Sequence, residues 1–203
     1  MSTRRRLLMA MCLKKPRLPR EFQEVEFLES TGTQYIDTGI IPQNHIGIKA
    51  KISLSYNIDF NCLISAGETD QQLIFLMGTS ISYFKYFAQG NASSFGFSYI
   101  INNIHNIEIT KNGNILINGR IYASSEYQEP ISSNLYLLRR TDGTQWFYGK
   151  LYSCKIYDND VIVRNYVPCY RKSDDVAGLY DLVNDVFYTN AGTGQFIVGG
   201  DVR

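Results

Sequence analysis

Hydrophobic and polar residues alternate over short stretches of this chain, and residues that favour turns separate one stretch from the next. The stretch 146–170 shows the pattern most clearly, because Cys154 and Ile156 flank Lys155 and an Asp-Asn-Asp run follows. A period of two places successive side chains on opposite faces of a strand. Asp and Asn suit a tight turn because they tolerate left-handed backbone. We therefore expect a hairpin here, with Lys155 and Arg164 facing solvent.

The same alternation predicts further strands along the chain. The hairpin at 106–121 carries the strongest turn signal, Asn112-Gly113, in which both residues are expected to take positive φ. The other predicted strands or hairpins cover residues 33–38, 47–54, 58–65, 72–77, 81–88, 95–100, 134–140 and 178–189. No helical period persists for three turns. About thirteen or fourteen short strands would curl as one open sheet, so two stacked sheets are expected.

Composition agrees with an all-β domain. The 203 residues include 15 Tyr and 11 Phe, and aromatic residues favour strands. A chain of this length can bury one substantial core. We expect an antiparallel β-sandwich over residues 21–203, preceded by a flexible basic arm over residues 1–20.

The arm is defined by its charge, because the first 20 residues hold seven basic residues and no acid. These residues are Arg4, Arg5, Arg6, Lys14, Lys15, Arg17 and Arg20. The other 183 residues then hold 13 basic and 19 acidic residues, a formal charge of −6. Such a domain is a poor nucleic-acid binder, so no specific nucleic-acid partner is expected. The arm itself is either a solvated tail or a contact for an acidic partner, RNA or an anionic membrane.

No targeting segment is predicted. The apolar run Leu7–Leu13 is short for a signal peptide, and Lys14 follows where small residues should mark a cleavage site. No apolar run approaches the roughly 20 residues of a membrane span. Synthesis in a cytoplasm is therefore expected.

The four cysteines are predicted to be free and buried. None forms a CxxC pair, which argues against a zinc ribbon. A turn centred on Asn159 would place Cys154 opposite residue 164, so Cys154 should not meet Cys169. Buried thiols fit a reducing compartment.

Three segments together resemble one family. They are FLESTGTQYIDTG (27–39), IEITKNGNILINGR (107–120) and the block from FYGKLYSCKIYD to NAGTGQF (147–196). They resemble laminin G-like, concanavalin A-like jelly-roll domains of phage and prophage proteins, and the resemblance spans roughly residues 22–198. It implies a non-enzymatic structural or appendage protein of a phage virion, anchored through the arm. Expected partners are other virion proteins, further copies of the chain and a host-surface glycan. The alternatives are a glycoside hydrolase and an assembly scaffold without a ligand.

The hydrolase alternative depends on two glutamates. Glu24-Val25-Glu26-Phe27-Leu28-Glu29 resembles the E-x-D-x-x-E strand of jelly-roll glucanases, in which the outer glutamates are nucleophile and acid/base. Here Glu26 replaces the Asp, and Glu24 and Glu29 should point to opposite faces of a regular strand. The alternative interpretation is that Glu24, Glu26 and Glu29 are solvated residues of an edge strand. His45 and His105 lie in no recognisable triad and are expected to be surface or hydrogen-bonded residues.

Calcium is the one cofactor that the resemblance leaves open, since many relatives of this fold bind it. Calcium needs six to eight oxygen ligands. The acidic turn residues are Asp142, Asp158, Asp160, Asp174 and Asp175. Their spacing matches no calcium loop, so we interpret them as turn-forming residues.

Sugar binding needs flat aromatic surface with polar groups beside it. The segment 81–99 is rich in both, and Trp146, the only tryptophan, follows a predicted turn at a sheet end. The candidate ligand-binding residues are Tyr83, Tyr86 and Trp146, with Asn91, Arg140 and Gln89 as weaker polar candidates. The alternative is that these aromatic rings belong to the core.

Overall fold

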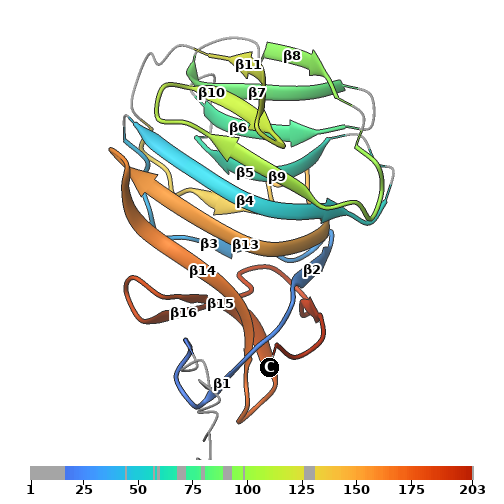
Figure 1. Cartoon of the computed structure of the whole chain (residues 1–203), viewed down its shortest axis with the longest axis vertical. Coiled ribbons are helices and arrows are strands. Elements are labelled where there is room, and N and C mark those ends of the chain that lie inside the picture. Colours follow the sequence, from blue (N-terminus) through green and yellow to red (C-terminus); the bar gives the residue numbers. More distant parts are fainter. Residues whose placement is uncertain are drawn as a thin grey trace, which may run out of the picture.

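Seventeen strands and no helix make up the described part of the chain. The computed structural model describes residues 17–43, 45–56, 58, 60–67, 72–78, 81–88, 93–97, 99–125 and 131–202. The strands form two antiparallel sheets that face each other as a sandwich (Figure 1). The all-β sandwich that the sequence predicts is confirmed. The described residues contain no helix that could cross a membrane.

The large sheet has eleven strands. Its main path runs β11 (Arg120–Ser124), β10 (Asn114–Ile117), β9 (His105–Ile109), β4 (Ile46–Leu54), β13 (Tyr148–Asp158), β14 (Val161–Arg171), β15 (Val176–Asp181) and β16 (Val186–Thr189). Three short strands join this path at its sides: β1 (Phe22–Glu24) pairs with β14, and β2 (Leu28–Thr31) pairs with β13 and with β17 (Ile197–Val198). The lower part of Figure 1 shows β14, β15 and β1 extending past the sandwich.

The small sheet has six strands. Their order is β3 (Ile36–Asp37), β12 (Tyr136–Leu137), β5 (Asn61–Ala66), β6 (Gln72–Met77), β7 (Ile81–Ala88) and β8 (Ser93–Gly96). Strands β6 and β7 match the predicted ranges, whereas the strand predicted over 134–140 is reduced to two residues and an isolated bridge at Arg139.

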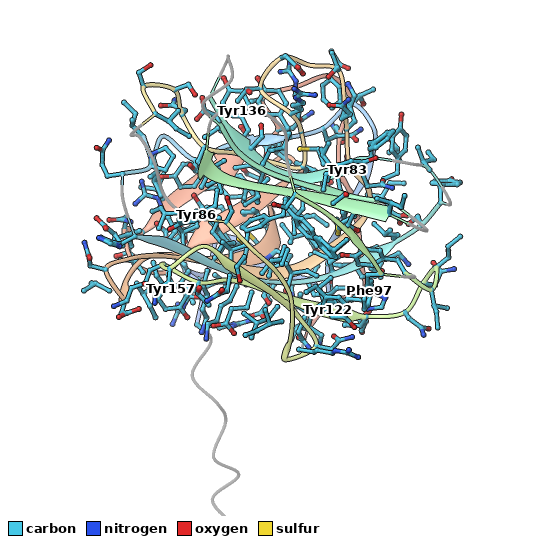
Figure 2. All side chains as sticks on the ribbon, turned by 90° about the horizontal axis from the view of Figure 1, so that it is seen from above. Tyr83, Tyr86, Phe97, Tyr122, Tyr136 and Tyr157 are labelled. Carbon is cyan, nitrogen blue, oxygen red and sulfur yellow. The ribbon has the colours of Figure 1, made fainter. Side chains whose placement is uncertain are left out.

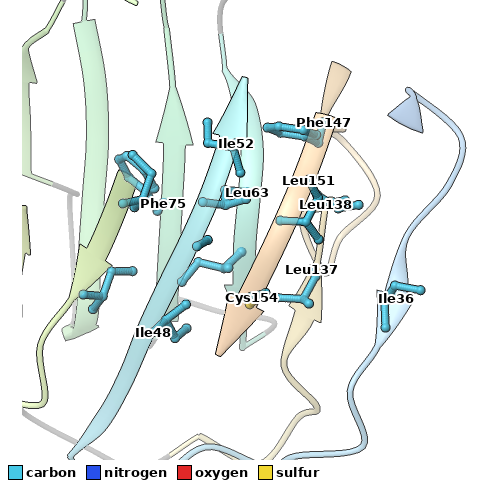
Figure 3. Packing of buried hydrophobic residues seen from close by; sticks show 14 of the residues in the cluster. Ile36, Ile48, Ile52, Leu63, Phe75, Leu137, Leu138, Phe147, Leu151 and Cys154 are labelled. Carbon is cyan, nitrogen blue, oxygen red and sulfur yellow. The ribbon is translucent and has the colours of Figure 1, made fainter. Parts of the chain in front are cut away.

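The core lies between the facing sheets. Ile52 of β4 and Leu151 of β13 point from the large sheet toward Leu63 of β5 and Leu137 of β12 (Figure 3), and all four are at most 1% exposed. Burying apolar area of this kind is the main favourable term in folding. The alternation in the sequence thus identified the buried face of β4 correctly.

A second, smaller core joins the N-terminal end to β14 and β15. Leu18 is 8% exposed and packs with Val167, Cys169 and Tyr180. Packed structure therefore includes Leu18, three residues before the predicted start at residue 21. Arg17, predicted to belong to the arm, forms an ion pair with Glu24. The other predicted anchoring residues, Arg4, Arg5, Arg6, Lys14 and Lys15, lie outside the described residues.

The hairpin of β13 and β14 has the predicted turn but a different register. Asn159 and Asp160 both take positive φ, 47° and 67°. A bulge after Ile156 shifts the pairing, so Cys154 lies opposite Tyr166 instead of residue 164. The three described cysteines are free and buried, as predicted.

The Asn112-Gly113 turn differs from its prediction. Gly113 alone takes positive φ, 75°, and its amide donates to the Thr110 carbonyl at 2.9 Å. The two-residue turn with both φ positive occurs instead at Asn118-Gly119, between β10 and β11. The first turn is longer because Thr110 also donates its amide to the carbonyl of Asn114.

The expectation that Arg164 faces solvent is wrong. Its side chain is 18% exposed, and its Nε lies 3.6 Å from Oδ2 of Asp181, which is fully buried. Asp181 also accepts hydrogen bonds from the amides of Asn165 (2.8 Å) and Val183 (3.0 Å). A buried carboxylate needs such partners, because an unpaired charge is costly away from water.

Candidate functional site

Three aromatic side chains gather on the outer face of the small sheet. The ring centroids of Tyr35 and Tyr136 lie 5.0 Å apart, and those of Tyr35 and Trp146 lie 6.1 Å apart. All three residues are half-buried. We call Tyr35, Tyr136 and Trp146 the aromatic cluster. It presents ring surface outside the core, on the opposite side of the small sheet from the large sheet.

Strand alternation places Tyr35 and Tyr136 there. Gln34 and Ile36 are buried, so Tyr35 between them points outward. The Tyr35 amide donates to Oδ1 of Asn190 at 3.1 Å, which ties this segment to the C-terminal loop. Tyr136 lies between β3 and β5 in the pairing of β12. The two tyrosines therefore meet on one face.

A kink at Leu138 brings an arginine onto the same face. Leu138 has φ 72°, an uncommon conformation for a residue with a branched side chain, and it is fully buried next to the buried Leu137. Two consecutive inward side chains break the alternation, so the half-buried Arg139 follows on the side of Tyr136. Such irregularities often re-aim side chains near functional sites.

The Arg139 guanidinium occupies the angle between two rings of the cluster. Its Cζ lies 4.7 Å from the ring centroid of Tyr35 and 4.8 Å from that of Trp146. Both distances are within the range of a cation–π interaction. An added Cβ at Gly143 would lie 2.7 Å from a terminal nitrogen of Arg139, so a glycine at this turn leaves room for the guanidinium.

Arg140 is held in a polar network beside the cluster. Its Nε lies 3.0 Å from Oδ2 of Asp142, and its Nη1 donates to Oε1 of Gln145 at 2.9 Å. Partial burial raises the pKa of Asp142, but hydrogen bonds from Thr144 and the charges of Arg140 and Arg139 outweigh it and hold that pKa below its ordinary value. Asp142 is therefore an anion whose closest cation is Arg140.

The hairpin that carries these groups is tied to β5. The Ser65 hydroxyl donates to the carbonyl of Arg139 (3.3 Å) and accepts from the amide of Thr141 (2.8 Å). The amide of Leu138 donates to the carbonyl of Leu63 at 2.7 Å. These bonds fix the hairpin against the sheet, so the cluster is positioned before any ligand arrives.

The predicted ligand-binding residues separate into four groups, of which the last is the buried Tyr86. Trp146 and Arg140 belong to the site, and Tyr83 lies on the same face but three strands away, against Phe60 at 5.2 Å. Figure 2 shows Tyr83 and Tyr136 on the same side of the molecule. Asn91 and Gln89 lie outside the described residues.

The prediction for Tyr86 is wrong. Its side chain is fully buried, and its hydroxyl lies 2.8 Å from the carbonyl oxygen of Ile46 and 3.0 Å from that of Lys111. Both carbonyls belong to the large-sheet side of the molecule, so Tyr86 links the two layers from within the core. A ligand cannot reach its ring.

The two glutamates of the hydrolase alternative lie on different strands and have different partners. Glu24 of β1 pairs with Arg17, whereas Glu29 of β2 accepts a hydrogen bond from Ser55. Retaining hydrolysis needs two carboxylates about 5 Å apart that face one sugar. Strand β1 pairs with β14, and β2 pairs with β13 and β17, so the two residues do not form the single-strand motif that suggested this role.

The two histidines also have structural surroundings. His105 is buried beside Phe97 and Tyr99, and burial lowers its pKa. His45 takes φ 68° at the start of β4. Neither histidine is paired with a serine or cysteine nucleophile among the contacts of the described residues.

The five acidic turn residues lie at three turns: Asp142 at one, Asp158 and Asp160 at the second, and Asp174 and Asp175 at the third. Asp142 pairs with Arg140, Asp160 with Lys111 and Asp174 with Arg171, and the described residues contain no group of three or more His, Cys, Asp or Glu side chains that could hold a metal ion. Asp158 accepts a hydrogen bond from the Asn159 side chain, and Asp175 takes φ 56° in its turn. The described residues therefore contain no cluster of acidic side chains that could coordinate calcium.

Comparison with known proteins gives the fold and no family. No family model and no curated protein matches the sequence. Among solved structures, a Bacteroides ovatus protein named "putative carbohydrate binding protein" matches with a TM-score of 0.60 and 13% identity, over 89% of this chain and 62% of that one. A heptameric SAP-like pentraxin from Limulus polyphemus matches with a TM-score of 0.49 and 9% identity, over 87% of this chain and 89% of that one. This chain thus spans less than two thirds of the Bacteroides protein, and the likeness shows a shared jelly-roll sandwich.

Three residues of the site were missed in the sequence. Tyr35 and Tyr136 stand at alternating positions of short strands, but nothing local indicates that the two strands are neighbours. Arg139 should point inward in a regular strand, and only the positive φ of Leu138 reverses this. Alternation could have identified the tyrosines as outward-facing, whereas no sequence signal identified Arg139.

Proposed function

We propose that the protein is a non-enzymatic carbohydrate-binding jelly roll, and that the aromatic cluster with Arg139 and Arg140 forms its ligand surface. The observation that carries this proposal is the set of three half-buried rings outside the core, at 5.0 and 6.1 Å from one another. Rings of this kind stack on the apolar faces of sugars, and neighbouring polar groups meet the hydroxyls. The name of the Bacteroides structure, which shares this fold, supports the same function.

The wider role that we propose is a structural or appendage protein of a phage virion. Its support is the sequence resemblance over roughly residues 22–198 and the contrast between the basic first 20 residues and the acidic remainder. In this role the arm attaches the protein to other virion proteins, further copies of the chain assemble beside it, and the sandwich meets a host-surface glycan. Deleting residues 1–16, which leaves Arg17 and Leu18 in place, should abolish incorporation into virions, and normal incorporation would contradict the anchoring role.

The carbohydrate-binding proposal is tested on a glycan array with three proteins. Wild-type protein should bind a defined set of glycans, and Trp146→Ala should weaken that binding about tenfold or more, as expected if stacking contributes about 1.4 kcal/mol. Tyr157→Ala is the matched control, because Tyr157 is also half-buried but lies on the opposite side of the molecule from Tyr136 in Figure 2. Absence of binding to every glycan would favour the scaffold without a ligand, and equal losses in both variants would contradict the assignment of the site.

A further inference from the structure

Arg139 differs from the other half-buried arginines that lie over aromatic rings. Arg164 and Arg171 also lie over rings, but each has a carboxylate within 4.0 Å, from Asp181 and Asp174. Arg139 lies over two rings, and no carboxylate of the described residues lies within 4.0 Å of its guanidinium nitrogens. The one acid nearby, on Asp142, is engaged by Arg140 and Thr144.

The charge of Arg139 is also partly removed from water. The residue is half-buried, and its Nε is shielded from solvent without a hydrogen-bond partner. Burying a charged group without a paired anion is costly, and the rings of Tyr35 and Trp146 offset this only in part. An anion that reaches the terminal nitrogens would add charge-assisted hydrogen bonds, which are about twice as strong as neutral ones.

We infer that the ligand of this site is an acidic saccharide, whose carboxylate or sulfate binds Arg139 while its ring lies on the aromatic cluster. The inference rests on the proposed function and narrows its ligand class. The planar guanidinium offers two parallel N–H donors that match both kinds of anion. The rings of Tyr35 and Trp146 and the lack of a side chain at Gly143 hold the guanidinium in place. Arg139 therefore loses little rotamer freedom when a ligand binds.

The test compares charged and neutral probes on variants of the full chain. The probes are sialylated, uronate-containing, sulfated and neutral oligosaccharides on one array, followed by titration of trigalacturonate and its methyl ester, in which each carboxylate is replaced by a neutral ester group. The inference predicts at least about tenfold tighter binding to the charged member of a pair. The sulfated and carboxylated arms distinguish the two sources of the anion.

Arg139→Met should remove this preference, so that the charged and neutral members of a pair bind with Kd values within about twofold of each other. Arg139→Lys, which keeps the charge but not the planar fork, should retain part of the preference. Arg120→Met is the matched control, because Arg120 is an exposed arginine whose Cζ lies 5.5 Å from the ring centroid of Tyr122. Circular dichroism and thermal melting confirm that each variant is folded.

The outcomes separate the inference from the proposed function. Binding to neutral glycans alone, or acidic binding that Arg139→Met leaves unchanged, would overturn the inference and leave carbohydrate binding in place. Binding to no glycan would overturn both. Loss of acidic binding in Arg120→Met equal to that in Arg139→Met would indicate a general charge effect and would also overturn the inference.

Discussion

Asp181 is a buried carboxylate with several polar partners, and its removal should strongly destabilise the protein. The carboxylate is fully buried. It accepts from the amides of Asn165 at 2.8 Å and Val183 at 3.0 Å, and from the Asn184 side chain at 2.6 Å, while Arg164 Nε lies 3.6 Å away. Asp181→Ala therefore removes the acceptor of two main-chain amides, one acceptor of the Asn184 side chain and the anion beside Arg164.

Removing one partner of a buried charge pair costs about 3–5 kcal/mol, because the remaining charge is left uncompensated. Total stabilities of natural domains are about 5–15 kcal/mol, so the variant should lose a large share of its stability. For a chain of this size each kcal/mol corresponds to roughly 2–4 °C, and the expected fall in Tm is roughly 6–20 °C. Asp181→Asn should fall between wild type and Asp181→Ala, because an amide oxygen can still accept the two main-chain bonds.

The assay is equilibrium unfolding in urea, followed by circular dichroism and by the fluorescence of the single tryptophan. A double-mutant cycle with Arg164→Met isolates the coupling between the two side chains. A loss below about 1 kcal/mol in Asp181→Ala would refute the reasoning, because that is the range of an exposed ion pair.

Three further predictions concern the turns, the thiols and pH. Gly113→Ala should lower the free energy of unfolding in urea by more than about 2 kcal/mol, because φ is 75° and the new Cβ would lie 2.0 Å from the carbonyl oxygen of residue 125. Gly119→Ala is the control and should lower it by only about 1–2 kcal/mol, because φ is positive there but no atom lies within 4 Å of the new Cβ. Equal losses in the two variants would contradict the predicted clash at residue 113. Burial raises the pKa of Cys154 and Cys169 to about 12, so iodoacetamide at pH 8 should label these thiols only when urea unfolds the protein. Mass spectrometry maps the labelled positions. Rapid labelling of the native protein would contradict this prediction, because it would show that the thiols are accessible. Burial lowers the pKa of His105 below its ordinary 6.5, so the unfolded chain binds a proton at higher pH than the folded chain, and stability should fall as pH drops below about 6.5. The urea midpoints of wild type and His105→Gln should therefore diverge over that pH range. Parallel plots of urea midpoint against pH would assign the pH dependence to other groups.

Much of the fold could be predicted because strand alternation is a local signal. The inward side chains Ile48 and Ile52 of β4 follow directly from the alternation, and β6 and β7 match their predicted ranges. The register of the β13–β14 hairpin could not be predicted from the sequence, because the bulge after Ile156 depends on packing against the neighbouring strands β4 and β15. The short strands β3 and β12 likewise depend on tertiary pairing, because β3 pairs with β12, and β12 pairs with both β3 and β5.

The candidate site was only partly predictable. Trp146 and Arg140 stood out as an unusual residue type and a charge near a turn. Tyr86 was misjudged because the outward and inward faces of β7 cannot be distinguished when both carry aromatic residues. Arg139 was missed because its direction depends on the positive φ of Leu138, a tertiary effect with no local signature.

The central claim is that the outer face of the small sheet, at Tyr35, Tyr136 and Trp146, binds saccharide. Trp146 is the only tryptophan of the chain, so its emission reports on this site alone. Titration with an oligosaccharide that binds on the array should change the Trp146 emission in a saturable way, with the same Kd as calorimetry. Binding by calorimetry with an unchanged emission spectrum would place the saccharide elsewhere and contradict the account.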